Sequence, residues 1–156
     1  MSTAVVRKMR REDLDEAMRI LGLWNMAPRS PSADVPDPER SNIEIENAFV
    51  AEFDGRIVGT CSYFMLDDNW AETASLAVDP ALKGGGVGAL LQQARLDEMR
   101  RRGVRRVRTE TDRPETIRWY VERFGYQVVG TNPKKHAFSL PGVDYWTVLE
   151  LDLTAV

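Results

Sequence analysis

The sequence predicts a mixed α/β fold with an antiparallel first half. The dipeptide Asp54-Gly55 lies between two apolar, strand-like runs, and it is the strongest short-range signal for a β-hairpin. A third strand-like run ends at Val78, where a glycine-rich loop, a helical segment and a further strand follow. Such a unit predicts a crossover between two parallel strands. The length of 156 residues suits a single domain spanning residues 1–156.

The first half is expected to contain an edge strand, a helix and three strands of a meander. A weak alternation of apolar and polar residues over 3–9 indicates the edge strand. Residues 11–26 carry apolar side chains at three- and four-residue spacing, which predicts a helix, and Asp13 is its expected N-cap. A proline-rich loop and a short helix or turn over 43–47 then lead to strands over 47–53, 56–66 and 70–78.

The second half alternates helices and strands. A helix is expected over residues 86–102, and its apolar face carries Leu90, Leu91, Ala94 and Met99. A second helix is expected over 114–124, with Asp112 as its N-cap and proline in its first turn. The strands of this half are expected over 104–109, 126–130 and 145–153.

Composition and charge exclude several classes of protein. The net charge of −3 and the pI near 5.3 argue against a general nucleic-acid binder, and the arginine-rich run over 95–108 is interpreted as a solvated face. No apolar run approaches the length of a membrane span, and residues 1–13 lack the apolar core of a signal peptide. We therefore expect a cytoplasmic protein without membrane or nucleic-acid partners.

The few sulfur and imidazole groups restrict the chemistry. Cys61 is the one cysteine and His136 the one histidine, so neither an internal disulfide nor a cysteine- or histidine-based metal cluster is expected. Cys61 lies in an apolar run and is predicted to be a small buried side chain, not a nucleophile.

The glycine-rich loop is the strongest functional signal. Four of the five residues over 84–88 are glycine, at the start of a helix, where bare backbone amides form an anion site. A Walker nucleotide loop is rejected, because no Gly-Lys-Ser/Thr follows. A dinucleotide fingerprint is only nominal, because residues 79–83 separate the strand from the glycines. The pyrophosphate of coenzyme A and a turn without any ligand are the remaining interpretations.

The run Val78-Asp79-Pro80-x-x-Lys83-Gly84-x-Gly86-Val87-Gly88-x-Leu90-Leu91 resembles the acetyl-CoA-binding motif of the GNAT superfamily of N-acetyltransferases. Lys83 stands where the family carries arginine or glutamine. The order of elements also resembles that family over most of the chain. The resemblance implies a mixed, mostly antiparallel sheet of about seven strands with one central splayed parallel pair and helices on both faces. It also implies an acetyltransferase that uses acetyl-CoA as donor and needs no metal.

The resemblance assigns the cofactor-binding residues as well. The pantetheine arm is expected to lie along the backbone of Leu76, Ala77 and Val78, and an amide near Leu76 or Ala77 is the expected oxyanion donor. The pyrophosphate is expected on the amides of the loop and the first helical turn, namely Lys83, Gly84, Gly85, Gly86, Val87, Gly88 and Ala89. Asp112 is expected beside the cofactor, at the helix start where the family usually carries asparagine.

Two catalytic residues follow from the same resemblance. Glu72, six positions before Val78, resembles the general base of histone-type members; a solvated or acceptor-binding carboxylate, with water as base, is the alternative. Tyr120 resembles the tyrosine that protonates the thiolate, although it stands one residue farther from Gly125 than the family pattern has it. The alternative places Tyr120 in the core, a role for which Trp119 is the stronger candidate.

The expected reaction is direct transfer of acetyl to a primary amine in a ternary complex. The expected partners are a small-molecule or peptide amine and, as a homodimer, a second copy of the chain. His136, Arg29, Glu44 and Glu46 are candidates for contact with the acceptor. Two rival functions stay open: an acyl-CoA-binding sensor without catalysis, and an enzyme that uses a nicotinamide dinucleotide.

Overall fold

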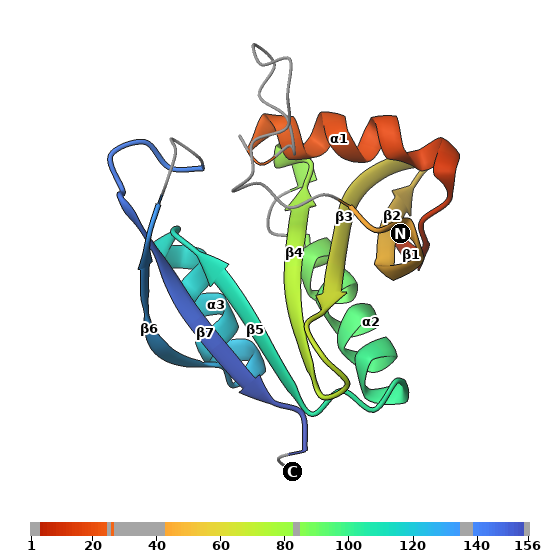
Figure 1. Cartoon of the computed structure of the whole chain (residues 1–156). Helices are drawn as coiled ribbons and strands as arrows, with labels where there is room; N and C mark the ends of the chain where they lie inside the picture. Colours follow the sequence, from red (N-terminus) through yellow and green to blue (C-terminus); the bar gives the residue numbers. More distant parts are fainter. Residues whose placement is uncertain (1–3, 25, 27–42, 83–84, 135–138, 155–156) are drawn as a thin grey trace.

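The computed structural model describes residues 4–24, 26, 43–82, 85–134 and 139–154. Within them, seven strands form one sheet in the order β1-β2-β3-β4-β5-β7-β6 (Figure 1). The strands are β1 (Val5–Lys8), β2 (Ala48–Phe53), β3 (Arg56–Met65), β4 (Trp70–Val78), β5 (Arg106–Thr111), β6 (Gln127–Pro133) and β7 (Tyr145–Asp152). The α-helices are α1 (Leu14–Leu23), α2 (Val87–Arg101) and α3 (Pro114–Phe124). The predicted fold class is confirmed.

The strands β4 and β5 form the one parallel pair between neighbouring strands of the described sheet. Their pairing is short: it begins at Trp70 opposite Arg106 and ends at Glu72 opposite Arg108. Beyond this point the two strands diverge, and Figure 1 shows the wedge that opens between them toward the end of β4. The splayed parallel pair expected from the resemblance is therefore present.

The sheet carries helices on both faces. On one face Leu91 and Met99 of α2 pack in one apolar core with Val58, Ala71 and Val107 of the central strands. On the opposite face α1 packs through Ile20 and Leu21 against Ala77 of β4. The third helix covers β5 and β7 on the same face as α2, where Tyr120 contacts Leu149 (Figure 1). Burial of these apolar stripes is the main favourable term in folding.

The turns and helix ends mostly follow their sequence signals. Asp54 and Gly55 both have positive φ (52° and 75°), as the two-residue hairpin turn requires. Gly125 ends α3 in the left-handed conformation, and its amide donates to the Val121 carbonyl at 3.2 Å, which is the αL arrangement of a helix C-terminus.

One predicted cap is right in position and the other is wrong. Asp13 is the N-cap residue of α1, but it has helical backbone angles and its side chain makes no cap bond; its carboxylate instead accepts from the Arg10 amide and pairs with Arg7. The N-cap of α3 is Arg113, also without a side-chain bond. Asp112 does not cap this helix because its carboxylate is held by groups that come after β6.

The apolar face of α2 is also displaced from the predicted one. Leu90 is 46% exposed, whereas the buried side of the helix carries Val87, Leu91, Gln92, Arg95, Leu96 and Met99. The reason is the phase set at the first turn, where Val87 packs into the core and places residues four and eight positions later against the sheet. This phase buries two polar side chains, Gln92 and Arg95. The interpretation of residues 95–108 as a solvated face is therefore wrong for Arg95.

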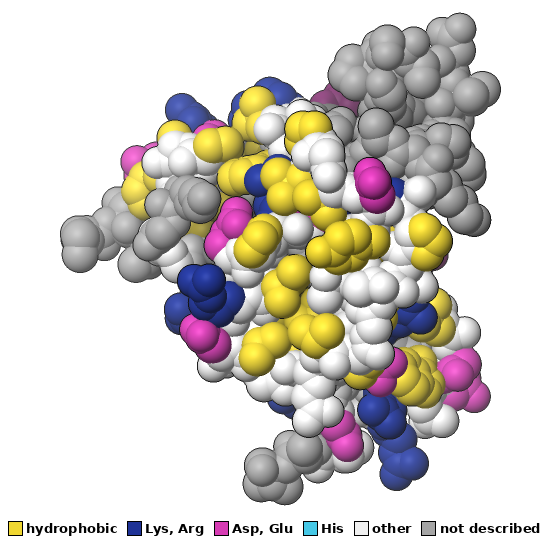
Figure 2. Space-filling view, turned by 90° about the vertical axis from the view of Figure 1, so that its left-hand side faces the viewer, with side chains coloured by type: hydrophobic (Ala, Val, Ile, Leu, Met, Phe, Trp, Pro, Cys, Tyr) yellow, Lys and Arg dark blue, Asp and Glu magenta, His cyan; other side chains and the backbone are white. Residues whose placement is uncertain are grey.

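One outer face of the sheet is partly apolar. On the side of the molecule that carries β6 and α3, apolar side chains gather in the middle of the surface (Figure 2). The exposed hydrophobic residues of these two elements are Val121, Val128 and Val129. No helix in the described part of the chain is long and apolar enough to cross a membrane.

Candidate functional site

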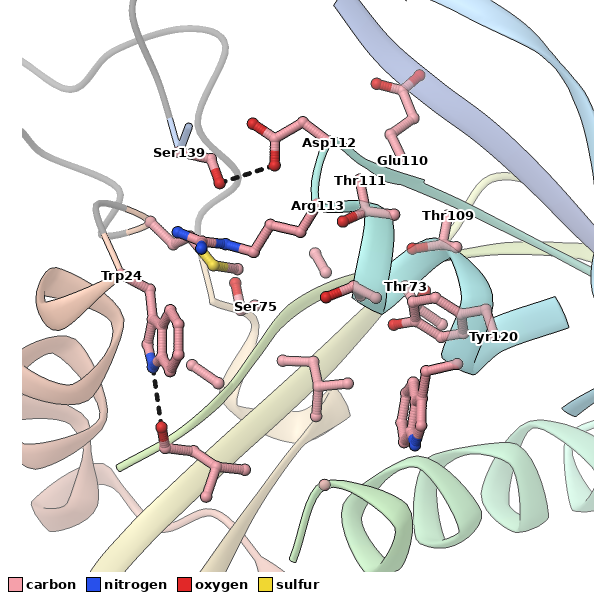
Figure 3. Close-up of a pocket in the computed structure, with 18 of the residues that line it drawn as sticks. Trp24, Thr73, Ser75, Thr109, Glu110, Thr111, Asp112, Arg113, Tyr120 and Ser139 are labelled. Atoms are coloured by element: carbon pink, nitrogen blue, oxygen red, sulfur yellow. Dashed lines mark hydrogen bonds between the residues drawn. The ribbon is translucent and has the colours of Figure 1, made fainter. Parts of the chain in front are cut away.

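A large cavity lies where β4 and β5 separate. Its volume is about 950 Å³, within the range of small-molecule sites. Its walls come from β4, β5, the first turn of α2, α3 and the end of α1. Figure 3 shows Thr73 of β4, Thr109 and Thr111 of β5 and Tyr120 of α3 around the same space. The strand divergence thus creates the site, since it withdraws backbone groups from the ladder and leaves room between them.

The first turn of α2 forms one end of the cavity. Gly86 precedes the helix with φ of 83°, a conformation that favours glycine. The amides of Val87, Gly88 and Ala89 belong to the first turn and have no partner within the helix, and all three residues line the cavity. A Cβ on Gly88 would lie 3.8 Å from Val78 and 3.9 Å from Trp119. This end therefore suits a phosphate-bearing group that approaches bare backbone.

Three further residues of the loop, Lys83, Gly84 and Gly85, were also predicted to bind the pyrophosphate. Lys83 and Gly84 lie outside the described residues. The Gly85 amide already donates to the Leu82 carbonyl at 3.1 Å, so its backbone N–H is engaged in a turn. The described part of the anion site therefore consists of the residues from Gly86 onward.

The backbone of β4 supplies a second wall. The Asp79 amide donates to Val58 of β3, and Ala77 lies opposite Thr60 of β3. Alternation along the strand therefore directs the backbone groups of Ala77 toward β3 and those of Leu76 and Val78 toward the cavity. The expectation that Ala77 offers free backbone groups is wrong, because the ladder to β3 uses them.

A β-bulge shapes β4 beside the cavity. The register with β3 shifts between Thr60 opposite Ala77 and Ser62 opposite Ala74, so two residues, Ser75 and Leu76, face the single Cys61. Ser75 has a φ of 58°, which is uncommon for a residue with a side chain. The bulge reorients the strand at the point where the cavity begins. No glycine or turn signal marked this position in the sequence.

Glu72 belongs to a charged group at the closed end of the wedge. Its Oε1 lies 3.6 Å from the Arg108 Nε, and Arg108 also pairs with Glu110 at 2.6 Å. Burial raises the pKa of the Glu72 carboxyl, the negative charge of Glu110 raises it further, and Arg108 opposes both effects. A carboxyl with a raised pKa beside a cavity is a candidate for proton transfer. The sequence did not single out Glu110, which lines the same cavity.

Tyr120 is 3% exposed and also lines the cavity. Its ring packs between Trp119 and Tyr126, with ring centres 5.0 and 4.8 Å away. Its hydroxyl oxygen accepts a hydrogen bond from the Arg95 Nη2 at 2.9 Å. The additional residue before Gly125 therefore leaves Tyr120 facing inward. Trp119 is partly buried and packs against the core cluster that contains Tyr120, as predicted, and it also lines the cavity.

Asp112 lies at the end of β5, beside the cavity, in a buried ion pair. Its Oδ2 lies 2.6 Å from the Lys134 Nζ. The same carboxylate accepts from the Ser139 hydroxyl and the Leu140 amide, both at 2.9 Å. These bonds lower the pKa of Asp112 although burial alone raises it. Asp112 thus fastens the segment before β7 to the cavity rim, and its contact with a cofactor stays a prediction.

The remaining predicted residues are placed as follows. Cys61 is fully buried, and burial raises its pKa to about 11, which removes it as a nucleophile at neutral pH. Glu44 and Glu46 line a separate, smaller cavity beside Lys8. His136 and Arg29 lie outside the described residues. In the described ranges no group of three or more acidic, histidine or cysteine side chains is placed to hold a metal ion.

Two further residues, Trp24 and Arg113, line the cavity. The Trp24 indole N–H donates to the Val78 carbonyl at 2.8 Å. The guanidinium of Arg113 lies 4.9 Å from the Trp24 ring centre, and Figure 3 shows its side chain extending toward Trp24. The apolar spacing of residues 11–26 marked Trp24 only as a core residue, so no sequence signal predicted this contact.

Comparison with known proteins agrees with this geometry. Residues 14–126 match the family model described as the acetyltransferase (GNAT) family. An amino-acid acetyltransferase of Shewanella oneidensis is 28% identical over 135 residues, covering 85% of this chain and 30% of that protein. The chain thus spans about 30% of the length of this curated relative.

Solved structures share the fold. The ribosomal-protein-S18-alanine N-acetyltransferase of Escherichia coli superposes with a TM-score of 0.74 at 18% identity, covering 99% of this chain and 96% of that chain. The yncA protein of Salmonella typhimurium, solved with its cofactor acetyl-CoA, gives the same TM-score, identity and coverage. At this level of identity the likeness concerns the fold alone.

Proposed function

The chain belongs to the GNAT family of acetyltransferases, and we propose that it transfers the acetyl group of acetyl-CoA to a primary amine by direct attack in a ternary complex. The observation that carries this proposal is the short parallel pairing of β4 and β5, which ends at Glu72 and Arg108. It leaves a cavity with a bare helix N-terminus at one end and a carboxylate at the other.

The chain offers acetyl-CoA three kinds of contact. The amides of Val87, Gly88 and Ala89 suit the pyrophosphate, together with Lys83 and Gly84 as predicted from the sequence. Leu76 and Val78 direct backbone groups toward the pantetheine arm. The Leu76 amide, within the bulge, is our candidate for the donor that polarises the thioester carbonyl. Bound acetyl-CoA supplies an acyl group activated as a thioester.

Glu72 is our candidate for the general base. An amine must lose a proton as it attacks, and a carboxylate accepts it well when its pKa lies closer to the working pH than that of an ordinary glutamate. Burial and Glu110 raise the pKa of Glu72 in this sense. The two carboxylates also favour an acceptor that arrives as an ammonium ion.

Direct transfer is supported by the placement of Cys61. An acyl-enzyme route needs a reactive nucleophile at the cavity, whereas this thiol is buried in the core and its Sγ donates to the Leu91 carbonyl at 3.5 Å. Tyr120 is our candidate for the group that protonates the departing thiolate, because it lines the cavity.

The experiment that tests the proposal measures thiol release from acetyl-CoA with a panel of amines that includes amino acids, peptides with free N-termini, and polyamines. Binding of acetyl-CoA is measured separately by calorimetry. Amine-dependent thiol release that falls by about 10²-fold or more in Glu72→Gln supports the function. Acetyl-CoA binding with no thiol release for any amine supports an acyl-CoA sensor instead, and absence of binding overturns the proposal.

A further inference from the structure

Arg95 is the largest fully buried side chain of the described structure. It lies on the sheet-facing side of α2, four residues after Leu91 and four before Met99, both of which are fully buried in the core. A guanidinium is charged at every working pH, and a buried charge without a partner is costly. No carboxylate in the described ranges pairs with Arg95, so its charge is balanced by neutral oxygen atoms alone.

Four hydrogen bonds hold the guanidinium. Its Nε donates to Gln92 Oε1 at 2.6 Å. Its Nη1 donates to the carbonyl oxygens of Ser62 and Ala74 at 3.0 and 3.2 Å. Its Nη2 donates to the Tyr120 hydroxyl at 2.9 Å. These partners come from α2, β3, β4 and α3, so one side chain ties together three of the elements that line the cavity, namely α2, β4 and α3.

Two of these partners lie at the cavity itself. Ala74 precedes the bulged residue Ser75, and Tyr120 is the candidate proton donor; both line the cavity, as does Arg95. A guanidinium only donates hydrogen bonds, so the Tyr120 oxygen must be the acceptor in their contact. The hydroxyl proton of Tyr120 is consequently directed away from Arg95. Packing of the Tyr120 ring against Trp119 and Tyr126 fixes the position of the hydroxyl oxygen.

We propose that Arg95 is a positioning residue for protonation of the leaving group: it fixes the Tyr120 hydroxyl and stabilises the negative charge that Tyr120 acquires when it donates its proton. The inference rests on the proposed function. It assigns a role to a residue that lies outside the glycine motif. As the acceptor nitrogen bonds to the acetyl carbon, the C–S bond breaks and its electron pair remains on sulfur. Tyr120 transfers its proton to that sulfur, and water returns a proton to Tyr120 afterwards.

The absence of a carboxylate beside Arg95 is what makes this role effective. The side chains that act on the guanidinium are Gln92, Cys61, Tyr120 and Tyr126. Burial raises the pKa of both Cys61 and Tyr126, so these groups are neutral at pH 7. The positive charge of Arg95 is therefore not cancelled, and in a buried site it acts strongly on an oxygen 2.9 Å away.

The first test separates turnover from binding. Arg95→Met should lower kcat by about tenfold or more, within the range of a single acid–base group, and should leave the KM for acetyl-CoA within about twofold. Arg95→Lys should recover part of the rate because it keeps the charge. The control is Arg102→Met, at the C-cap of the same helix. Arg102 donates to the Tyr63 hydroxyl at 2.8 Å, outside the cavity, so this variant should keep wild-type kcat.

A double-mutant cycle isolates the coupling. In the Tyr120→Phe background, Arg95→Met should lower kcat by less than about twofold further, because the group on which Arg95 acts is gone. Melting temperatures of all variants establish that they are folded. An Arg95→Met enzyme that keeps wild-type kcat, or one that loses the same factor with and without Tyr120, overturns the inference.

A second readout needs no turnover. Bound coenzyme A carries a free thiol, with an ordinary pKa of about 8.5, and its thiolate is detected by ultraviolet absorbance. Wild type and Arg102→Met should form the bound thiolate at lower pH than Arg95→Met. This shift without acetylation of any amine would leave the Arg95 assignment standing and remove the proposed function. Equal titrations in wild type and Arg95→Met overturn the assignment, and a wild-type chain that binds no coenzyme A overturns both.

Discussion

The indole N–H of Trp24 donates to the carbonyl oxygen of Val78 at 2.8 Å, at the last residue of β4. Alternation along β4 directs this carbonyl toward the cavity, where a pantetheine amide is expected to pair with it. The end of α1 therefore occupies a position that the proposed donor substrate also requires. The stack of Arg113 on the same ring, at 4.9 Å, holds the indole across the mouth of the cavity.

Replacing Trp24 by Phe should strengthen acetyl-CoA binding. The variant keeps an aromatic ring but no longer donates to Val78, so the substrate does not compete with the indole. A hydrogen bond of about 1 kcal/mol corresponds to about fivefold in the dissociation constant, measured by calorimetry. Trp70→Phe, at the far end of β4, is the control and should leave the affinity unchanged. Weaker binding by Trp24→Phe would mean that the indole contacts the substrate favourably.

Gly88→Asp should weaken acetyl-CoA binding by at least about tenfold, because it adds a negative charge to the first turn of α2, where the pyrophosphate is expected. Gly88→Ala should fold and bind nearly as wild type, since its Cβ would lie 3.8 Å from Val78 and 3.9 Å from Trp119. Gly88→Asn separates charge from size. Equal affinities for the aspartate and asparagine variants would remove the phosphate assignment at this turn.

Local signals predicted most of the fold. Turn chemistry at Asp54-Gly55 and the boundaries of α3 follow from residues adjacent in sequence, and they agree with the structure. The glycine motif predicted where α2 begins for the same reason. The pairing of β4 with β5 and its early end were expected only through the resemblance, because no local pattern records where two distant strands diverge.

The parts of the site that escaped prediction depend on tertiary contacts. The bulge at Ser75 arises from the register with β3, which periodicity along one strand cannot specify. Asp112 looked like a helix cap, yet Lys134 and the backbone of Leu140, which follow β6 in the sequence, compete for its carboxylate. Arg95 did leave a signal: it stands on the stripe through Leu91 and Met99, where an arginine interrupts an otherwise apolar face.

Asp112→Asn should destabilise the fold, because it leaves the Lys134 ammonium without its carboxylate in a site where the two side chains are 5% and 1% exposed. Breaking a buried pair in this way costs roughly 3–5 kcal/mol, measured by urea denaturation at pH 7. The pKa of Asp112 is lowered in the folded state, so its contribution is present at neutral pH. It is lost as the pH falls below the ordinary value of 3.8.

The variant should therefore show a flatter loss of stability in acid than wild type. Glu115→Gln, in the exposed first turn of α3, is the matched control and should change the stability by no more than about 0.5 kcal/mol. An Asp112→Asn protein as stable as wild type would mean that the Lys134 charge finds another partner.

Glu72→Gln should lower kcat by about 10² to 10⁴-fold, the usual range for a general base, with little change in the KM for acetyl-CoA. The glutamine keeps the shape of the side chain but accepts no proton. The acid limb of the pH–rate profile, which reports the carboxylate form, should disappear in this variant. A rate within about twofold of wild type would assign the proton to water and leave Glu72 as an acceptor-binding residue.

Glu110→Gln should move the acid limb of the wild-type profile to lower pH. The negative charge of Glu110 raises the pKa of Glu72, whereas the guanidinium of Arg108 lowers it. Removing Glu110 abolishes the repulsion and also frees Arg108, which it holds at 2.6 Å, to interact with Glu72; both effects lower the pKa of Glu72. Arg108→Met should move the limb in the opposite direction. Profiles of kcat/KM against pH measure the direction in which the acid limb shifts in each variant. Shifts in the same direction in both variants would exclude Glu72 as the group that titrates.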